Sequence, residues 1–323
     1  MRLIACSLLA GSLLLTAGGV AAQDFPNRVV RVIVGDTPGA ASDTAIRLLS
    51  QKLSDIWKQQ VVVENRPGAN WIIAAEVAAK AKPDGYTFLA AIPSLLTMNQ
   101  VVYKSLPYDT LRDFAGVTQI ATNHFAVIVN PSLPARTVAD LVKLAKARPG
   151  EMLYGSPGVG NQQHLAVEIF ARATDIKIVH VPHRGTAPAV LSLISGQVAM
   201  AIPAALVVAP HVASGKLRML ATLGPKRVNA FPDVPTLVES GYPDVLVTGW
   251  TGLVAPRGTP QDILDKVARD VARVLTADDV RSVLATPGSD LTSSSPREFD
   301  AFIRSEMDKW AKVIRAVGLE NTQ

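Results

Sequence analysis

Residues 29–57, VVRVIVGDTPGAASDTAIRLLSQKLSDIW, carry the pattern from which the fold can be inferred. The β-branched run at its start favours a buried strand, and the apolar residues further on, spaced three or four apart, define one face of a helix. They are Val29, Val30, Val32, Ile33 and Val34 in the strand and Ile46, Leu49, Leu53 and Ile56 in the helix. A loop of small residues joins the two, and free N–H groups of the first helical turn would point at whatever it holds. The unit can therefore bind a small anion.

Within this loop, we expect ligand contacts from the backbone and from two polar side chains. Pro38, Gly39 and Ala40 allow a ligand to approach the main chain closely. Ser42 or Asp43 can cap the helix. A plain turn between a strand and a helix would also explain these residue types.

The first 22 residues have the pattern of a secretory signal peptide. Arg2 precedes an apolar run, and small residues follow up to Ala22, where we expect cleavage. The run, from Leu8 to Leu15, is shorter than the roughly 20 residues that a membrane-spanning helix needs. Residues 3–6, LIAC, resemble a lipoprotein box but have no apolar segment before them. We therefore expect a protein exported to the periplasm of a Gram-negative bacterium.

Composition narrows the range of functions. The single cysteine, Cys6, would leave with the signal peptide, so the mature chain could form no disulfide and use no thiol nucleophile. Loss of Arg2 lowers the formal charge from +5 to +4, a balance that mildly favours anionic ligands. No basic block is present, which argues against nucleic-acid binding. His180 and His183 are the only close pair among five histidines, so we expect neither a metal site nor a cofactor.

Strand-like and helix-like segments alternate along most of the chain, which is typical of an α/β protein with largely parallel sheets. Irregular crossings near 117–130 and 217–235 indicate two lobes. We expect lobe 1 to contain residues 23–122 and to be completed by 225–323, with lobe 2 at 123–224. Capping signals begin three of the helices, at Thr137, Thr259 and Ser295.

A series of short motifs follows the signal peptide. They are FPNRVVRVIV at 25–34, QVVVENRPGA at 60–69, KPDGYT at 82–87, LPYD at 106–109, YGSPGVG at 154–160, QHL at 163–165, HVP at 180–182 and FPDVPT at 231–236. None of them is diagnostic alone. In this order, the mature chain resembles the periplasmic receptors of tripartite tricarboxylate transporters, the Bug-type receptors, nearly from end to end.

The resemblance implies a type II periplasmic-binding-protein fold of the α/β class. Its two lobes, each a mostly parallel sheet flanked by helices, close on a small carboxylated metabolite. Family members are not enzymes: they deliver ligand to a membrane permease, and some feed signalling systems instead. The ligand carboxylates are held mainly by backbone N–H groups, hydroxyls and water. We therefore expect a monomer with no catalytic residues, a small organic acid as ligand, and the permease subunits of such a transporter as partners.

Two loops of the first lobe depart from the family pattern. Asp36 stands where relatives carry an aromatic residue. In the cleft it would repel a carboxylate by on the order of 1 to 4 kcal/mol, so it either faces outward or indicates a ligand that is not a simple dianion. Asn70 and Trp71 stand where relatives have glycines. Trp71 either packs within the lobe or stacks on an aromatic or hydrophobic acid.

The remaining site candidates also follow from the resemblance. Ser94 and Thr97 of the third loop either offer hydroxyls to the ligand or cap a helix. In the second lobe, the segment that contains Ser156, Gly160, Asn161 and His164 either donates hydrogen bonds to an anion or simply starts a helix. His183 and Arg184 lie at the expected cleft mouth, where Arg184 either binds a carboxylate or is solvated. Ala204 matches a position that often carries Asp or Ser, which indicates a less polar pocket.

The sequence thus predicts a receptor for a small carboxylated metabolite, either aromatic or less anionic than a tricarboxylate. One alternative is a secreted α/β hydrolase, although no Gly-x-Ser-x-Gly, His-Glu-x-x-His or Ser-x-x-Lys motif assigns a nucleophile or metal. Another is an orphan receptor of the same fold that serves a signalling system.

Overall fold

The computed structural model describes residues 25–39, 41–183, 185–285 and 288–322. The signal peptide predicted at 1–22 lies outside them. The chain begins with β1 (Val30–Val34), α1 (Ala41–Trp57), β2 (Val61–Asn65), η1 (Ala69–Trp71), α2 (Ile72–Ala79), β3 (Thr87–Ala91), η2 (Ser94–Met98), α3 (Asn99–Val102) and α4 (Thr110–Asp113). The burial of Val30, Val32, Ile33 and Val34 agrees with the β-branched run that predicted β1.

A long strand, β4 (Phe114–His124), then leads into the second group of elements. They are β5 (Ala126–Val129), α5 (Val138–Ala147), β6 (Leu153–Ser156), α6 (Gln162–Thr174), β7 (Val179–Pro182), α7 (Thr186–Ile194), β8 (Met200–Ala201), α8 (Ala205–Ala213) and β9 (Arg218–Thr222). The chain returns through β10 (Thr248–Pro256), α9 (Gln261–Leu275), α10 (Asp278–Leu284), β11 (Ser289–Leu291) and α11 (Pro296–Ala316).

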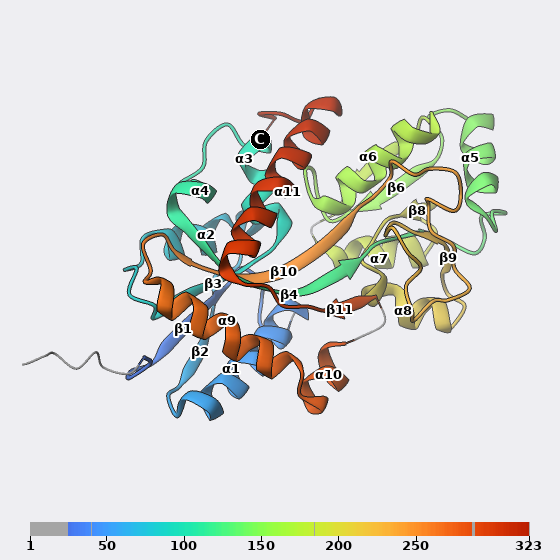
Figure 1. The fold of residues 1–323 in the computed structure, drawn as a ribbon. Coiled ribbons are helices and arrows are strands. Elements are labelled where there is room, and N and C mark those ends of the chain that lie inside the picture. The colour runs from blue at the N-terminus through green and yellow to red at the C-terminus, as the bar shows by residue number, and fades with distance from the viewer. Residues whose placement is uncertain (1–24, 40, 184, 286–287, 323) are drawn as a thin grey trace, which may run out of the picture.

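Two sheets with flanking helices form two lobes, which confirms the predicted α/β class (Figure 1). The strand orders are β11-β4-β10-β3-β1-β2 in the first lobe and β7-β6-β8-β5-β9 in the second. The pairs β1–β2, β1–β3, β6–β7 and β6–β8 are parallel. The other five pairs among the described strands are antiparallel, so the sheets are mixed rather than mostly parallel as expected. The strands at the lobe junction, β4, β5 and β10, pair antiparallel with their neighbours, because the chain reverses direction where it crosses between lobes.

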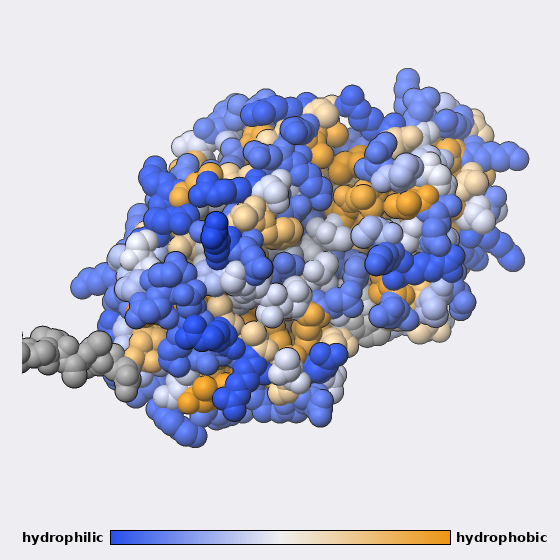
Figure 2. Space-filling view, in the orientation of Figure 1, coloured by the Kyte–Doolittle hydropathy of each residue, from blue (hydrophilic) through white to orange (hydrophobic). Residues whose placement is uncertain are grey.

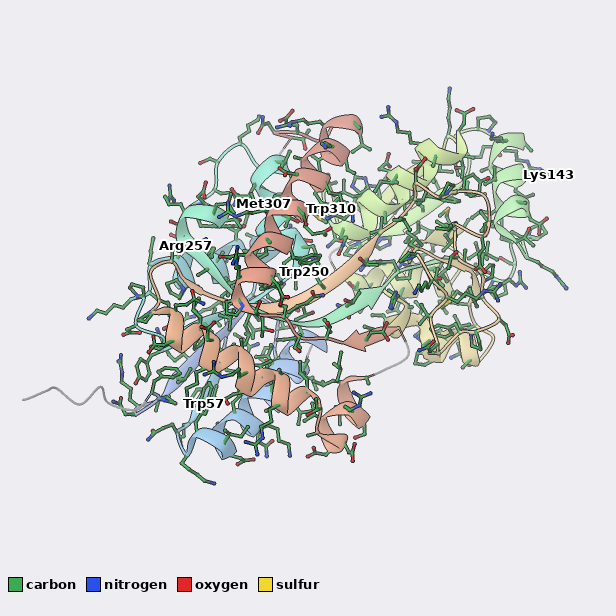
Figure 3. The ribbon with its side chains drawn as sticks, viewed as in Figure 1. Trp57, Lys143, Trp250, Arg257, Met307 and Trp310 are labelled. Carbon is green, nitrogen blue, oxygen red and sulfur yellow. The ribbon has the colours of Figure 1, made fainter. Side chains whose placement is uncertain are left out.

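Three segments connect the lobes. Strand β4 pairs with β10 from Phe114 to His124 and continues through Phe125 into β5. Helix α11 is the third: Phe299 packs in the hydrophobic core of the first lobe, and Trp310 packs in that of the second. Figure 3 shows Trp310 on this helix and Trp250 of β10 beneath its N-terminal half. The predicted second lobe ended at 224, whereas Leu237, Val245 and Val247 also pack in the second core, so we place the return crossing at β10.

Two of the three predicted helix caps were confirmed and one was wrong. Thr137 and Ser295 form complete capping boxes with Asp140 and Glu298, as predicted. The prediction for Thr259 was wrong, because its hydroxyl donates to the Pro256 carbonyl at 2.7 Å and α9 starts without a side-chain cap. No helix among the described residues combines the length and apolar character needed to cross a bilayer.

Candidate functional site

Three loops of the first lobe follow the carboxyl ends of β1, β2 and β3, and side-chain hydrogen bonds hold them together. The Nδ2 group of Asn65, at the end of β2, donates to the Asp36 carbonyl at 2.9 Å and to Asp43 Oδ1 at 2.8 Å. In the next loop, Asn70 Nδ2 donates to Asn99 Oδ1 at 2.7 Å. Carboxyl ends of parallel strands are where α/β folds commonly bind ligands.

Asp43 holds the first loop in place. It is the third residue of α1 and is 1% exposed. Its Oδ2 accepts the Gly39 N–H at 2.8 Å and Arg47 Nε at 2.9 Å. Burial opposes ionisation, but the hydrogen bonds from Arg47, Gly39 and Asn65 outweigh it, so the pKa of Asp43 lies below its usual value. Because α1 begins at Ala41, neither Ser42 nor Asp43 is its N-cap residue, and that expectation was wrong; Asp43 instead binds the N–H just before the helix.

The Asp36 carboxylate lies at the first turn of the same helix. Its Oδ2 accepts a hydrogen bond from the Ser42 hydroxyl, and the Asp36 side chain remains partly exposed. Pro38 and Gly39 are exposed, and Ala40 lies outside the described residues. Ser42 and Asp43, two polar residues predicted to contact a ligand, therefore use their side chains in hydrogen bonds within the protein.

Trp71 packs inside the first lobe. It is 6% exposed and belongs to the first hydrophobic core. Its ring covers Gly35 so closely that a Cβ atom at Gly35 would lie 2.3 Å from Trp71 Cδ2. Ala69, Asn70 and Trp71 all have positive φ, between 45° and 70°, a conformation that costs a non-glycine residue about 1–2 kcal/mol. Packing and the Asn70–Asn99 contact hold the loop in this shape.

The third loop is largely enclosed. Ser94 is 3% exposed and Thr97 is fully buried. The Thr97 hydroxyl donates to the Pro93 carbonyl at 2.7 Å, inside its own helical turn. The adjoining Asn99 Nδ2 donates to the Tyr108 hydroxyl at 3.3 Å.

The second lobe contributes the segment between β6 and α6. Ser156 is fully buried, and its Oγ lies 2.6 Å from His180 Nε2. Asn161 caps α6, with its Oδ1 accepting the Gln163 N–H at 2.9 Å. His164 is 5% exposed, and its Nδ1 accepts the Gly160 N–H at 3.2 Å. Ser156 and His164 thus support the loop from beneath.

The other second-lobe candidates lie around this loop. The His183 N–H donates to the Ser156 carbonyl at 2.9 Å, and His183 Nδ1 is buried without a partner among the described residues. Ala204 is the N-cap residue of α8 and is partly buried. Arg184 lies outside the described residues.

The short helix α3 brings the two groups of loops together. Its first residue, Asn99, bonds the Trp71-bearing loop through Asn70. Its last residue, Val102, touches the second-lobe loop: a Cβ atom at Gly160 would lie 3.0 Å from Val102 Cγ1. Gln162 Nε2 adds a hydrogen bond of 2.9 Å to the Thr248 carbonyl on the lobe junction. Loops that are more than 50 residues apart in sequence therefore meet at one place.

Several residues of this arrangement were missed by the sequence analysis. Asn65, Tyr154 and His180 lie inside motifs that were recognised but were not assigned to the site. Glu168, which bonds the Tyr154 hydroxyl, lies four residues after His164, so helical spacing could have identified it. Asn99 offers no sequence signal, because its partner Asn70 is remote.

Comparison with known proteins agrees with this fold. The family model described as "Tripartite tricarboxylate transporter family receptor" matches residues 45–319. Protein BugT of Bordetella pertussis is 35% identical over 303 residues, which cover 94% of this chain and 93% of BugT. The solved structure of R. palustris Rpa4515 with adipate has a TM-score of 0.84 and 34% identity, covering 91% of this chain and 99% of that one. MatC from Rhodopseudomonas palustris with bound malate has a TM-score of 0.80 and 27% identity, covering 90% and 100%.

The fold and the two opposed groups of loops define a two-lobed periplasmic binding protein. This chain belongs to the tripartite tricarboxylate transporter receptor family. That family consists of substrate-binding receptors rather than enzymes. Among the described residues, no group of three or more His, Cys, Asp or Glu is placed to hold a metal ion.

Proposed function

We propose that the protein is a periplasmic receptor that captures a small carboxylated metabolite between its two groups of loops. The observation that carries the proposal is the position of α3, where Asn99 contacts the first-lobe loops and Val102 contacts the Gly160 loop. A ligand between these loops would touch both lobes and could stabilise their closure. The adipate and malate in the two related structures support a carboxylate as the ligand class.

Charge supports an acid with few negative charges. Residues 35–43, 68–71, 92–99 and 153–164 contain no Lys or Arg, and the first of these segments carries Asp36 and Asp43. Arg184 is the only Lys or Arg among the candidate site residues, and it lies outside the described residues. Arg47 neutralises Asp43 at 2.9 Å, but no described cation pairs with Asp36. A tricarboxylate would meet repulsion from Asp36 of on the order of 1 kcal/mol or more. A mono- or dicarboxylate, with an apolar or aromatic body, fits these loops better.

Ligand delivery to the permease subunits of a tripartite tricarboxylate-type transporter is the partner function that family membership supports. Supply of the ligand to a signalling system is the alternative function for the same fold.

A hydrolase, the enzymatic alternative, has less support. Ser156 and His180 have the spacing of a nucleophile and its base, but Ser156 is fully buried and Glu168 bonds Tyr154 instead of orienting His180. We therefore propose a monomeric receptor without catalytic activity.

A thermal-shift series tests the ligand class. Benzoate, adipate, malate and tricarballylate are compared at equal concentration, because a ligand stabilises the folded state by RT ln(1 + [L]/Kd). We expect benzoate or adipate to raise the melting temperature most and tricarballylate least. Stabilisation by sugars or cations, together with no shift from any of the four acids, would contradict the proposal.

Transport is tested separately in cells. Deleting the receptor gene should abolish uptake of the labelled acid that binds best, and the wild-type gene should restore it. Unchanged uptake, with loss of a transcriptional response to the acid, would favour the signalling alternative.

A further inference from the structure

Three aromatic rings from three elements of the second lobe stack beneath the Ser156–Gly160 loop. They belong to Tyr154 of β6, His164 of α6 and His180 of β7. The centroids of the two imidazoles are 4.1 Å apart with an interplanar angle of 19°. The Tyr154 and His180 centroids are 4.9 Å apart at 16°. The proposed capture of a ligand does not by itself require this cluster.

Both imidazoles direct a nitrogen at the loop. His164 Nδ1 accepts the Gly160 N–H at 3.2 Å. His180 Nε2 lies 2.6 Å from Ser156 Oγ, which in turn accepts the Gly158 N–H at 3.2 Å. Gly158 and Gly160 have φ of 148° and 73°. Glycine adopts such values readily but also many others, so these two residues alone do not fix the loop in one conformation. The hydrogen bonds from the cluster to Gly160 and, through Ser156, to Gly158 therefore hold the loop in its conformation.

Acceptance of an N–H by Nδ1 requires that this nitrogen carry no proton. Burial lowers the pKa of His164 to about 4, so the ring is neutral near pH 7. The proton of the neutral ring is then on Nε2, which lies 3.7 Å from Glu168 Oε1. At 3.7 Å the two atoms are beyond hydrogen-bond distance, but the Glu168 carboxylate, which accepts the Tyr154 hydroxyl, still favours a proton on the nitrogen that faces it.

We propose that His164 is a positioning residue of the ligand site: its neutral ring, held in the stack with Tyr154 and His180, binds the Gly160 amide and so sets the conformation of the 158–161 loop against Val102. The inference rests on the proposed function for its effect on ligand affinity. The groups that face His164 are Glu168 on its own helix, Tyr154 on β6 and His180 on β7, and His183 is near enough to His180 to influence its charge.

Two substitutions separate positioning from packing. His164→Phe keeps an aromatic ring in the stack but removes the acceptor, whereas His164→Asn keeps an acceptor near the place of Nδ1 and removes the ring. His211→Asn, on α8 and outside the cluster, is the matched control. We expect His164→Phe to bind adipate and benzoate about tenfold more weakly, as loss of one well-placed hydrogen bond implies. The affinity of His164→Asn should stay nearer to that of the wild type, and that of His211→Asn should be unchanged.

The wild-type protein provides a second measurement that needs no ligand. Imidazole ¹⁵N NMR should show His164 as the Nε2–H tautomer, and the Gly160 amide should exchange slowly with solvent. Wild-type affinity in His164→Phe, equal losses in both His164 variants, or a protonated Nδ1 would each overturn the inference. If the wild type binds none of the acids, the proposed function fails, while the tautomer and the exchange rate still decide whether His164 holds the loop.

Discussion

The two strand-loop-helix units of the proposed site, β1–α1 and β6–α6, look similar in sequence but are held by different chemistry. In β1–α1 a charged carboxylate, Asp43, binds the loop, and a large apolar ring, Trp71, covers the end of the strand. In β6–α6 the neutral rings of His164 and His180 perform the same task. Small residues in a loop therefore permit a ligand-binding shape, and residues outside the loop stabilise it.

The difference has a direct consequence for the response to acid. The pKa of Asp43 lies below its usual value, so the first-lobe loop keeps its charged anchor in mild acid. Burial lowers the pKa of His164 to about 4, and burial together with the charge of His164 lowers that of His180 to about 4. On acidification, the first lobe should lose its loop anchor by protonation of a carboxylate and the second by protonation of imidazoles.

The largest effect is expected from Trp71→Ala. Removing this buried ring should lower the free energy of unfolding by about 3–5 kcal/mol. Gly35→Ala should cost about 1–3 kcal/mol in the wild type, because the new methyl group would overlap the ring. In the Trp71→Ala background the same change should cost little. Urea denaturation of the four proteins measures this coupling, and equal costs of Gly35→Ala in both backgrounds would mean that the ring does not occupy this space in solution.

A smaller effect is expected from acid. The unfolded chain binds protons on histidine with a pKa near 6.5, whereas His164 and His180 in the folded state bind them only near pH 4. Stability should therefore be full above about pH 6.5 and should fall as the pH is lowered toward 4, by about 3 kcal/mol for His164 and by less for the more exposed His180, whose charge water screens. Urea midpoints measured across this range should show a weaker pH dependence in His164→Phe. An identical slope in the variant would indicate that His164 is exposed or already protonated.

Asp43→Ala should lower the free energy of unfolding by about 2 kcal/mol. It removes the hydrogen bonds that Asn65 Nδ2, the Gly39 N–H and Arg47 Nε make to a carboxylate that is 1% exposed, and a hydrogen bond to a charged group contributes about 1.5–3 kcal/mol. The loss should persist at pH 7, where the histidine anchors are intact. A change below about 0.5 kcal/mol would show that water replaces the carboxylate without cost.

The smallest effect on stability is expected from Asp36→Asn, a change at the other carboxylate of residues 35–43. Asp36 is partly exposed and bonds only the flexible Ser42 hydroxyl among the described residues, so stability should change by less than about 0.5 kcal/mol. Affinity for tricarballylate should rise about fivefold, as removal of about 1 kcal/mol of repulsion implies. Calorimetric titration measures it, and an unchanged preference among acids would place Asp36 away from the ligand.

The C-terminal helix, α11, shows what local sequence patterns can and cannot predict. The capping signal at Ser295 predicted the start of α11 correctly, and the helix runs to Ala316. The pattern could not show that Phe299 and Trp310 pack in the cores of different lobes, because both belong to one continuous apolar face of the helix.

Figure 2 shows apolar surface where the C-terminal half of α11 meets α6, and the partly buried residues there include Val313 and Val317. The end of the chain returns to α3, where the Asn321 N–H donates to the Val101 carbonyl at 3.0 Å (Figure 1).

Local periodicity, capping residues and the order of short motifs were sufficient to predict the α/β class, the two lobes and the receptor family, because these features depend on neighbours in the chain. They also predicted which loops form the proposed site. They could not determine which polar groups in those loops remain free for a ligand. Asp43 is bonded to Asn65 and Ser156 to His180, partners that lie more than 20 residues away. Those contacts exist only once strands β1 and β2, and β6 and β7, are aligned side by side, so the roles of these residues depend on the folded arrangement.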